Sequence, residues 1–123
     1  MAISSLSGFL IQSPVKAGAS QSRICNTGQY LVFTKWNTNG QLVYKAFQGN
    51  YSSNEEPNQD PNLILYNGRN KYINGGSQEV RTWTAGGGYT YQIIGPSEQG
   101  GGDTRSFLIV KRKNKVIVNQ QCQ

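Results

Sequence analysis

Short runs of β-branched and aromatic residues recur along this chain, and most of them end at glycine or asparagine. Runs of this kind at a spacing of about 8–12 residues are typical of sandwiches and barrels. No longer stretch shows the 3.6-residue periodicity of an amphipathic helix. We therefore expect one all-β domain over residues 1–123, a β-sandwich or barrel of about eight or nine short antiparallel strands. The expected strands are 7–15, 29–36, 41–48, 62–66, 71–73, 79–83, 89–94, 105–111 and 115–119.

The clearest predicted element is a hairpin formed by residues 29–36 and 41–48. Asn39 and Gly40 lie between the two runs, and an Asn-Gly pair at this place predicts a type I′ turn. Both strands carry apolar side chains at odd and at even positions. A strand that is apolar on both faces is buried on both faces. The hairpin is therefore expected in the middle of a sandwich, or in a sheet that another subunit covers.

The net charge of +6 is distributed unevenly along the chain. Residues 1–54 hold four basic and no acidic residues, and residues 104–123 hold five basic residues. All six acidic residues lie in residues 55–103, together with three basic ones. Basic ends around an acidic middle can attract an anionic partner or pair with the acidic part of a second copy.

The two cysteines, Cys25 and Cys122, lie close to opposite ends of the sequence. A disulfide between them would tie the last strand to an early one and would constrain most of the unfolded chain. Two free, buried thiols are the alternative, because pairing depends on the Cα separation and on the compartment.

The first residues do not resemble a signal peptide, because they carry no positive charge before a short apolar run at Gly8–Ile11. No stretch approaches the length of a transmembrane span. The sequence thus predicts a cytosolic protein, or a mature secreted or virion protein whose leader has been removed.

The chain contains no histidine. The commonest general base and the commonest metal ligand are therefore missing, and Ser-His-Asp or Cys-His catalysis is excluded. The carboxylates cluster in polar segments, with Glu55, Glu56 and Asp60 in one and Glu98 and Asp103 in another. Mobile loops are poor places to hold two carboxylates in catalytic geometry. We expect a protein that is not an enzyme and that uses no cofactor and no metal.

A basic run near the C-terminus, formed by Lys111, Arg112, Lys113 and Lys115, is a candidate anion-binding site. At a hairpin tip these charges could contact a nucleic acid or an anionic surface. Binding sites for single-stranded nucleic acids normally place aromatic residues among the charges, and the run itself has none. A solvated turn that keeps strand edges from pairing is the alternative interpretation.

One segment has the chemistry of a sugar site: Asn58, Asp60, Asn62 and Tyr66 lie at alternate positions or nearly so. It resembles the QxDxNxVxY motif of the monocot mannose-binding lectins, with Ile64 in place of Val and Asn58 in place of Gln. The resemblance implies that Asp60, Asn62 and Tyr66 bind a mannose while Ile64 packs below it. That family repeats its motif, whereas this chain carries one clear copy over nine residues. A turn followed by an ordinary strand is the alternative.

Two tryptophans, Trp36 and Trp83, are candidate stacking platforms for a sugar ring. In the run 79–83 the alternation places Trp83 on the same face as Glu79 and Arg81. Together with loops rich in Asn, Gln, Gly and Tyr, these residues predict a lectin-like, carbohydrate-binding module that takes a glycan. A self-assembling subunit of a capsid, tail or appendage is the first alternative, and a homo-oligomer is expected in either case. A nucleic-acid or membrane-surface binder that uses the basic hairpin is the second.

Overall fold

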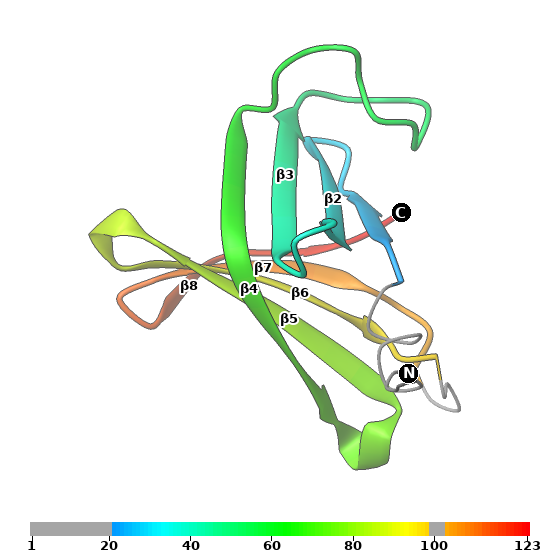
Figure 1. Ribbon diagram of the computed structural model, residues 1–123, viewed down its shortest axis with the longest axis vertical. Helices are drawn as coiled ribbons and strands as arrows, with labels where there is room; N and C mark the ends of the chain where they lie inside the picture. Colours follow the sequence, from blue (N-terminus) through cyan, green and yellow to red (C-terminus); the bar gives the residue numbers. More distant parts are fainter. Residues whose placement is uncertain (1–20, 99–102) are drawn as a thin grey trace, which may run out of the picture.

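The computed structural model describes residues 21–98 and 103–123, and it shows one antiparallel sheet of eight strands that is curled into a half-barrel (Figure 1). Each strand pairs with the next along the chain, so the sheet is a simple meander. The described ranges contain no α-helix, and the all-β prediction is confirmed. No helix in these ranges is long and apolar enough to cross a membrane. The strands are β1 (Arg23–Asn26), β2 (Tyr30–Trp36), β3 (Leu42–Gln48), β4 (Leu63–Ile73), β5 (Gln78–Ala85), β6 (Tyr89–Pro96), β7 (Phe107–Arg112) and β8 (Lys115–Gln121).

The sheet bends within β4, which pairs with β3 through its first half and with β5 through its second half. In Figure 1, β4 runs from beside β3 down to the lower end of β5, and β5–β8 cross beneath β2 and β3. At the bend the register shifts, so that Tyr66 and Asn67 lie opposite Val43 alone. Such a bulge kinks a strand and increases its twist. The sequence predicts a turn at Asn67-Gly68, and that prediction is wrong, because the chain continues as one strand.

Trp83 of β5 explains why the bend contains a glycine. A Cβ atom added to Gly68 would lie 2.3 Å from the Trp83 Nε1 atom. The indole N–H donates a 2.9 Å hydrogen bond to the Leu42 carbonyl oxygen on β3. The indole therefore crosses directly over the Gly68 backbone, and any larger residue there would displace it.

The core fills the concave face of the curled sheet. Trp83 and Tyr44 lie at its centre, with ring centroids 5.2 Å apart. On the outer face, Leu31 and Phe47 are also fully buried, so the predicted hairpin of β2 and β3 is buried on both faces. The buried core cluster comprises Cys25, Val32, Leu42, Tyr44, Ala46, Trp83, Ile93, Leu108 and Val110.

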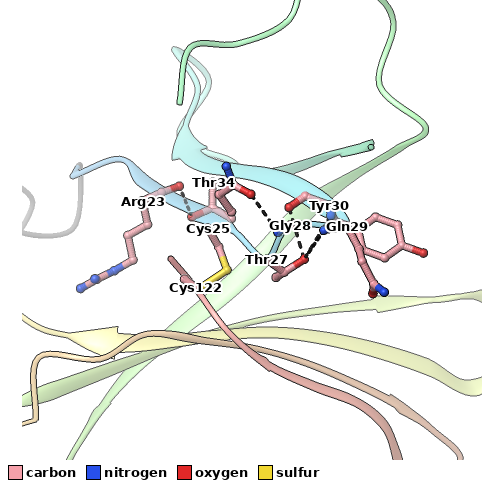
Figure 2. Close-up of a disulfide and its surroundings, with 9 residues drawn as sticks. Arg23, Cys25, Thr27, Gly28, Gln29, Tyr30, Thr34 and Cys122 are labelled. Carbon is pink, nitrogen blue, oxygen red and sulfur yellow. Dashed lines mark hydrogen bonds between the residues drawn. A yellow bond between two sulfur atoms is a disulfide. The ribbon is translucent and has the colours of Figure 1, made fainter. Parts of the chain in front are cut away.

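The first and last strands are joined by a disulfide between Cys25 on β1 and Cys122 just beyond β8 (Figure 2). The Gln123 N–H also donates to the Asn26 carbonyl oxygen at 2.7 Å. In Figure 1 the C-terminus accordingly runs back beside the start of the sheet. Within the described residues β1 and β8 do not pair as strands, so the sheet stays an open half-barrel.

Two further predictions about local structure differ from the observed fold. The β2–β3 turn has a positive φ at Gly40 alone, so it is not the predicted type I′ turn, which needs a positive φ at both central residues. Lys113 and Asn114, between β7 and β8, show that pattern instead. Strand β1 was not predicted, because four residues are too few for a clear pattern. The predicted strand 7–15 lies outside the described residues.

Candidate ligand pocket and basic tip

Four tyrosines gather on the concave face at one end of the half-barrel. Tyr30 comes from β2, Tyr44 from β3, and Tyr89 and Tyr91 from β6. Side chains two apart on a strand share a face, so Tyr89 and Tyr91 stack with their ring centroids 6.3 Å apart. The Tyr44 ring lies 5.4 Å from that of Tyr91 across the interior. The hairpin of β2 and β3 and the distant strand β6 thus build one aromatic cluster.

These tyrosines line a cavity of about 240 Å³. The cavity lies between β2–β4 on one side and β6–β8 on the other, where the half-barrel is open. Asn62, directly before β4, also forms part of its wall. The remaining walls are apolar and are formed by Ala46, Leu63, Leu108, Val110, Ile117 and Val118. An apolar, aromatic hollow at the mouth of a β-barrel is a common form of small-molecule site.

The hydroxyl groups of these four tyrosines have no hydrogen-bond partner among residues 21–98 and 103–123. Burial raises the pKa of the Tyr44 phenol well above its usual value, and the nearby phenols of Tyr91 and Tyr30 add to the rise. Burial also raises the pKa of Tyr91, with Tyr89 as the next contributor. The raised pKa keeps the Tyr44 and Tyr91 phenols protonated at physiological pH, so both can donate to a ligand oxygen.

A second group of interior side chains is polar and charged. Glu79 and Arg81 of β5 are 2% and 0% exposed, although both carry charges. The Glu79 Oε1 atom accepts from Arg81 Nε at 3.1 Å and from Arg23 Nε at 2.8 Å. The Asn70 Nδ2 group donates to the second carboxylate oxygen at 3.0 Å. This group, here called the buried charge cluster, consists of Arg23, Glu79, Arg81 and Asn70.

Arg81 is fully engaged within this cluster and its surroundings. Its guanidinium donates to the Thr34 hydroxyl at 3.0 Å and to the Gln21 carbonyl oxygen at 2.6 Å. Its Cζ atom lies 4.7 Å from the centre of the Trp36 ring. Burial lowers the pKa of Arg81, and the neighbouring Glu79 charge opposes that effect. Because its donors are satisfied by the protein, the cluster acts as structural support and not as an open binding site.

The basic run lies at the turn between β7 and β8, as the sequence predicts. Arg112, Lys113 and Lys115 are exposed, and Lys111 is partly buried. Arg112 pairs in register with Tyr89, and its Cζ atom lies 5.3 Å from the centre of the Tyr89 ring. The Lys113 N–H donates to the Gly88 carbonyl oxygen at 2.9 Å. This tip, consisting of Lys111, Arg112, Lys113 and Lys115, is called the basic tip below.

The residues of the lectin-like motif are not gathered around one hollow. Asn58 and Asp60 are exposed in the loop between β3 and β4. The Asn62 side-chain oxygen accepts from the Gln48 N–H at 2.7 Å, so it fixes the start of β4. Tyr66 is 51% exposed. It lies on the outer face of β4, because the alternate residues Leu63 and Leu65 pack on the core.

The two tryptophans likewise face the interior. Trp83 is 1% exposed and bonds to the Leu42 carbonyl, so it offers no face on which a sugar could stack. Trp36 is partly buried under Arg81. The reason in both cases is the register of the sheet, which turns these positions toward the core.

Sequence reasoning missed Tyr30 and Tyr44 as site residues and missed the buried charge cluster. The spacing of Tyr89 and Tyr91 was a usable signal, but the meeting of three strands was not visible. The alternation in β5 also placed Glu79 and Arg81 on the same face as Trp83, and this pattern could have indicated the buried charge cluster. No group of three or more potential metal-ligating side chains occurs among the residues with described placement.

The arrangement can hold a ring-shaped ligand against tyrosine faces, with phenol hydroxyls to orient it and cations at its rim. Among the described residues, the lining holds no carboxylate. No protein-family model, no curated protein and no solved structure gives a significant match to this chain.

Proposed function

We propose that this protein is a non-enzymatic binding module whose ligand enters the tyrosine pocket. The carrying observation is the set of four tyrosines whose hydroxyls lack partners among the described residues around an apolar cavity. None of these hydroxyl oxygens is among the buried unpartnered atoms of the described residues, so they are open to solvent and can donate to a ligand that enters the cavity.

The ligand that suits this pocket is small and ring-shaped. A cavity of about 240 Å³ is below the usual range for drug-sized molecules and suits one ring system. Sugars and aromatic heterocycles both stack on tyrosine and both accept hydrogen bonds from phenols. The proposal therefore includes a carbohydrate ligand, which is the class expected from the sequence. The tyrosines, and not the tryptophans, would then form the surface on which the sugar ring stacks.

A screen with a pocket-filling variant tests this proposal. A panel of glycans and heterocyclic fragments is tested for an increase in the thermal unfolding midpoint, which binding to the folded state must cause. Ala46→Leu adds bulk to the cavity wall and should abolish the increase. Thr84→Leu, at an exposed position, is the matched control. Equal binding by Ala46→Leu would move the site elsewhere, and a panel without any binder would reject the proposal.

Self-assembly is a second candidate function, and the edge of β8 favours it. Within the described residues β8 pairs only with β7, and Val116 and Ile117 are 50% and 51% exposed. Exposed apolar edge strands readily pair with another chain. Antiparallel pairing of two β8 strands about Ile117 would place Lys115 opposite Asn119, so no like charges would meet.

Light scattering at low and high salt tests the assembly. A larger uniform particle that falls apart in Ile117→Lys would support β8 pairing. A mass that stays near 13.6 kDa would reject it.

A further inference from the structure

The basic tip and the tyrosine pocket form one continuous feature. Tyr89, which lines the pocket, lies opposite Arg112 on the neighbouring strand and under its guanidinium. Lys115 pairs with Arg112 in register, so it belongs to the same face of the sheet. The aromatic residues that the basic run lacks in sequence are thus supplied by β6.

The cations of the basic tip have no acidic partner among the described residues. The ion pairs found there join Glu79 to Arg23 and Arg81, Glu56 to Lys45, and Asp103 to Arg105. Arg112, Lys113 and Lys115 are exposed. They can therefore contact an external anion without first breaking an ion pair with these acids.

We infer that the pocket and tip together bind single-stranded nucleic acid, with one base on the tyrosines and the adjoining phosphates on the basic tip. This inference rests on the proposed function of the pocket and names its ligand class. Non-specific single-strand sites combine a cationic path for the backbone with aromatic rings on which bases stack. A neutral sugar would leave the cations unused, and the bases of a duplex are stacked and cannot enter the pocket.

The salt dependence of binding gives the first quantitative test. If three or four phosphates are neutralised, the logarithm of affinity falls with a slope of about −2 to −3 against the logarithm of salt. Raising salt from about 50 to about 200 mM should then weaken binding by roughly 20–50-fold. The measurement is fluorescence anisotropy with labelled single-stranded DNA and RNA oligomers, and with mononucleotides as competitors. Effective competition by a mononucleotide would show that the site binds a free nucleotide, and it would overturn the inference that the ligand is a single strand.

Two sets of variants separate the roles of charge and ring. Arg112→Gln/Lys115→Gln should weaken binding and reduce the magnitude of the salt slope by about 1.4, because two phosphate contacts are lost. Lys35→Gln/Lys71→Gln removes the same charge from exposed sites on other strands and should leave the slope unchanged. Tyr89→Leu should weaken binding about tenfold with the slope unchanged, because stacking does not involve counterions. Tyr89→Phe keeps the ring and should bind nearly as the parent does.

Several results would overturn the inference. These are the absence of oligomer binding, equal binding of duplex, full affinity in Tyr89→Leu, or binding to anionic lipid vesicles without binding to oligomers. Near-ultraviolet circular dichroism of each variant shows whether it has folded. If fragments bind the parent protein but not Ala46→Leu, and oligomers do not bind, the nucleic-acid inference fails and the proposed function stands.

Discussion

The buried charge cluster leads to a quantitative stability prediction for Glu79→Gln. The carboxylate accepts hydrogen bonds from the two cations Arg23 and Arg81 and from the uncharged amide of Asn70. Glutamine keeps one acceptor, but its amide group must face the Asn70 amide, which is also a donor. The fully buried Arg81 and the partly buried Arg23 would then remain without an acid.

The expected loss follows from these contacts. Each guanidinium bond loses about 1–1.5 kcal/mol when its acceptor loses its charge, and the donor facing Asn70 costs about 1–2 kcal/mol more. The total is about 3–5 kcal/mol, which agrees with the measured range for breaking a buried ion pair. With a urea m-value of about 1.5 kcal/mol/M, the unfolding midpoint should fall by about 2–3 M.

Urea denaturation followed by tryptophan fluorescence measures this change. Glu56→Gln is the matched control, because it removes an acid from the exposed pair with Lys45 and should cost less than about 1 kcal/mol. High salt should weaken the control pair and leave the buried cluster nearly unchanged. If Glu79→Gln and Glu56→Gln lose equal stability, the cluster is not the support that its burial implies, and the reasoning is refuted.

Three further perturbations test other parts of the structure. Raising the pH above about 10 should destabilise the fold, because tyrosines of the unfolded chain ionise near that pH while the buried Tyr44 stays protonated. Tyr44→Phe should remove part of this loss of stability. Tyrosinate absorbance and the unfolding free energy as functions of pH measure the effect. Replacing Cys25 and Cys122 by serine removes the cross-link between residues 97 positions apart and should lower the unfolding free energy by up to about 4.7 kcal/mol in the chain-entropy model. An unchanged thermal unfolding midpoint would contradict a stabilising role of this disulfide. Gly68→Ala should lower the unfolding free energy by about 1–3 kcal/mol, because the added methyl group displaces the Trp83 indole. The displacement should shift the maximum of tryptophan fluorescence. An unshifted maximum would show that the bend in β4 relaxes and leaves the indole in place.

Much of the fold could be predicted because strand formation is a local property. The predicted strands 29–36, 41–48 and 89–94 lie within a residue or two of β2, β3 and β6. Alternation of side chains along a strand also placed Glu79, Arg81 and Trp83 on one face, and all three prove to be interior. The error at Asn67-Gly68 arose because the same dipeptide favours a hairpin turn and a sharp bend, and only Trp83 packing decides between them.

The candidate site was less predictable, because it depends on contacts between distant strands. The basic tip was found from consecutive charges, but its aromatic neighbour Tyr89 lies more than twenty residues away and meets Arg112 only through sheet register. Asn62 was expected to bind a sugar and instead accepts from the Gln48 backbone while it lines the pocket.

The sequence by itself determined the all-β class, the approximate strand positions, the positive hairpin tip and the lack of any histidine-based chemistry, because each depends on composition or on neighbours along the chain. Tertiary structure alone decided that the sheet curls into a half-barrel, that Cys25 meets Cys122, and that four tyrosines share one cavity. The physical reason is that curvature comes from the bulge in β4 and from packing across the sheet, and these contacts join residues that no local pattern relates.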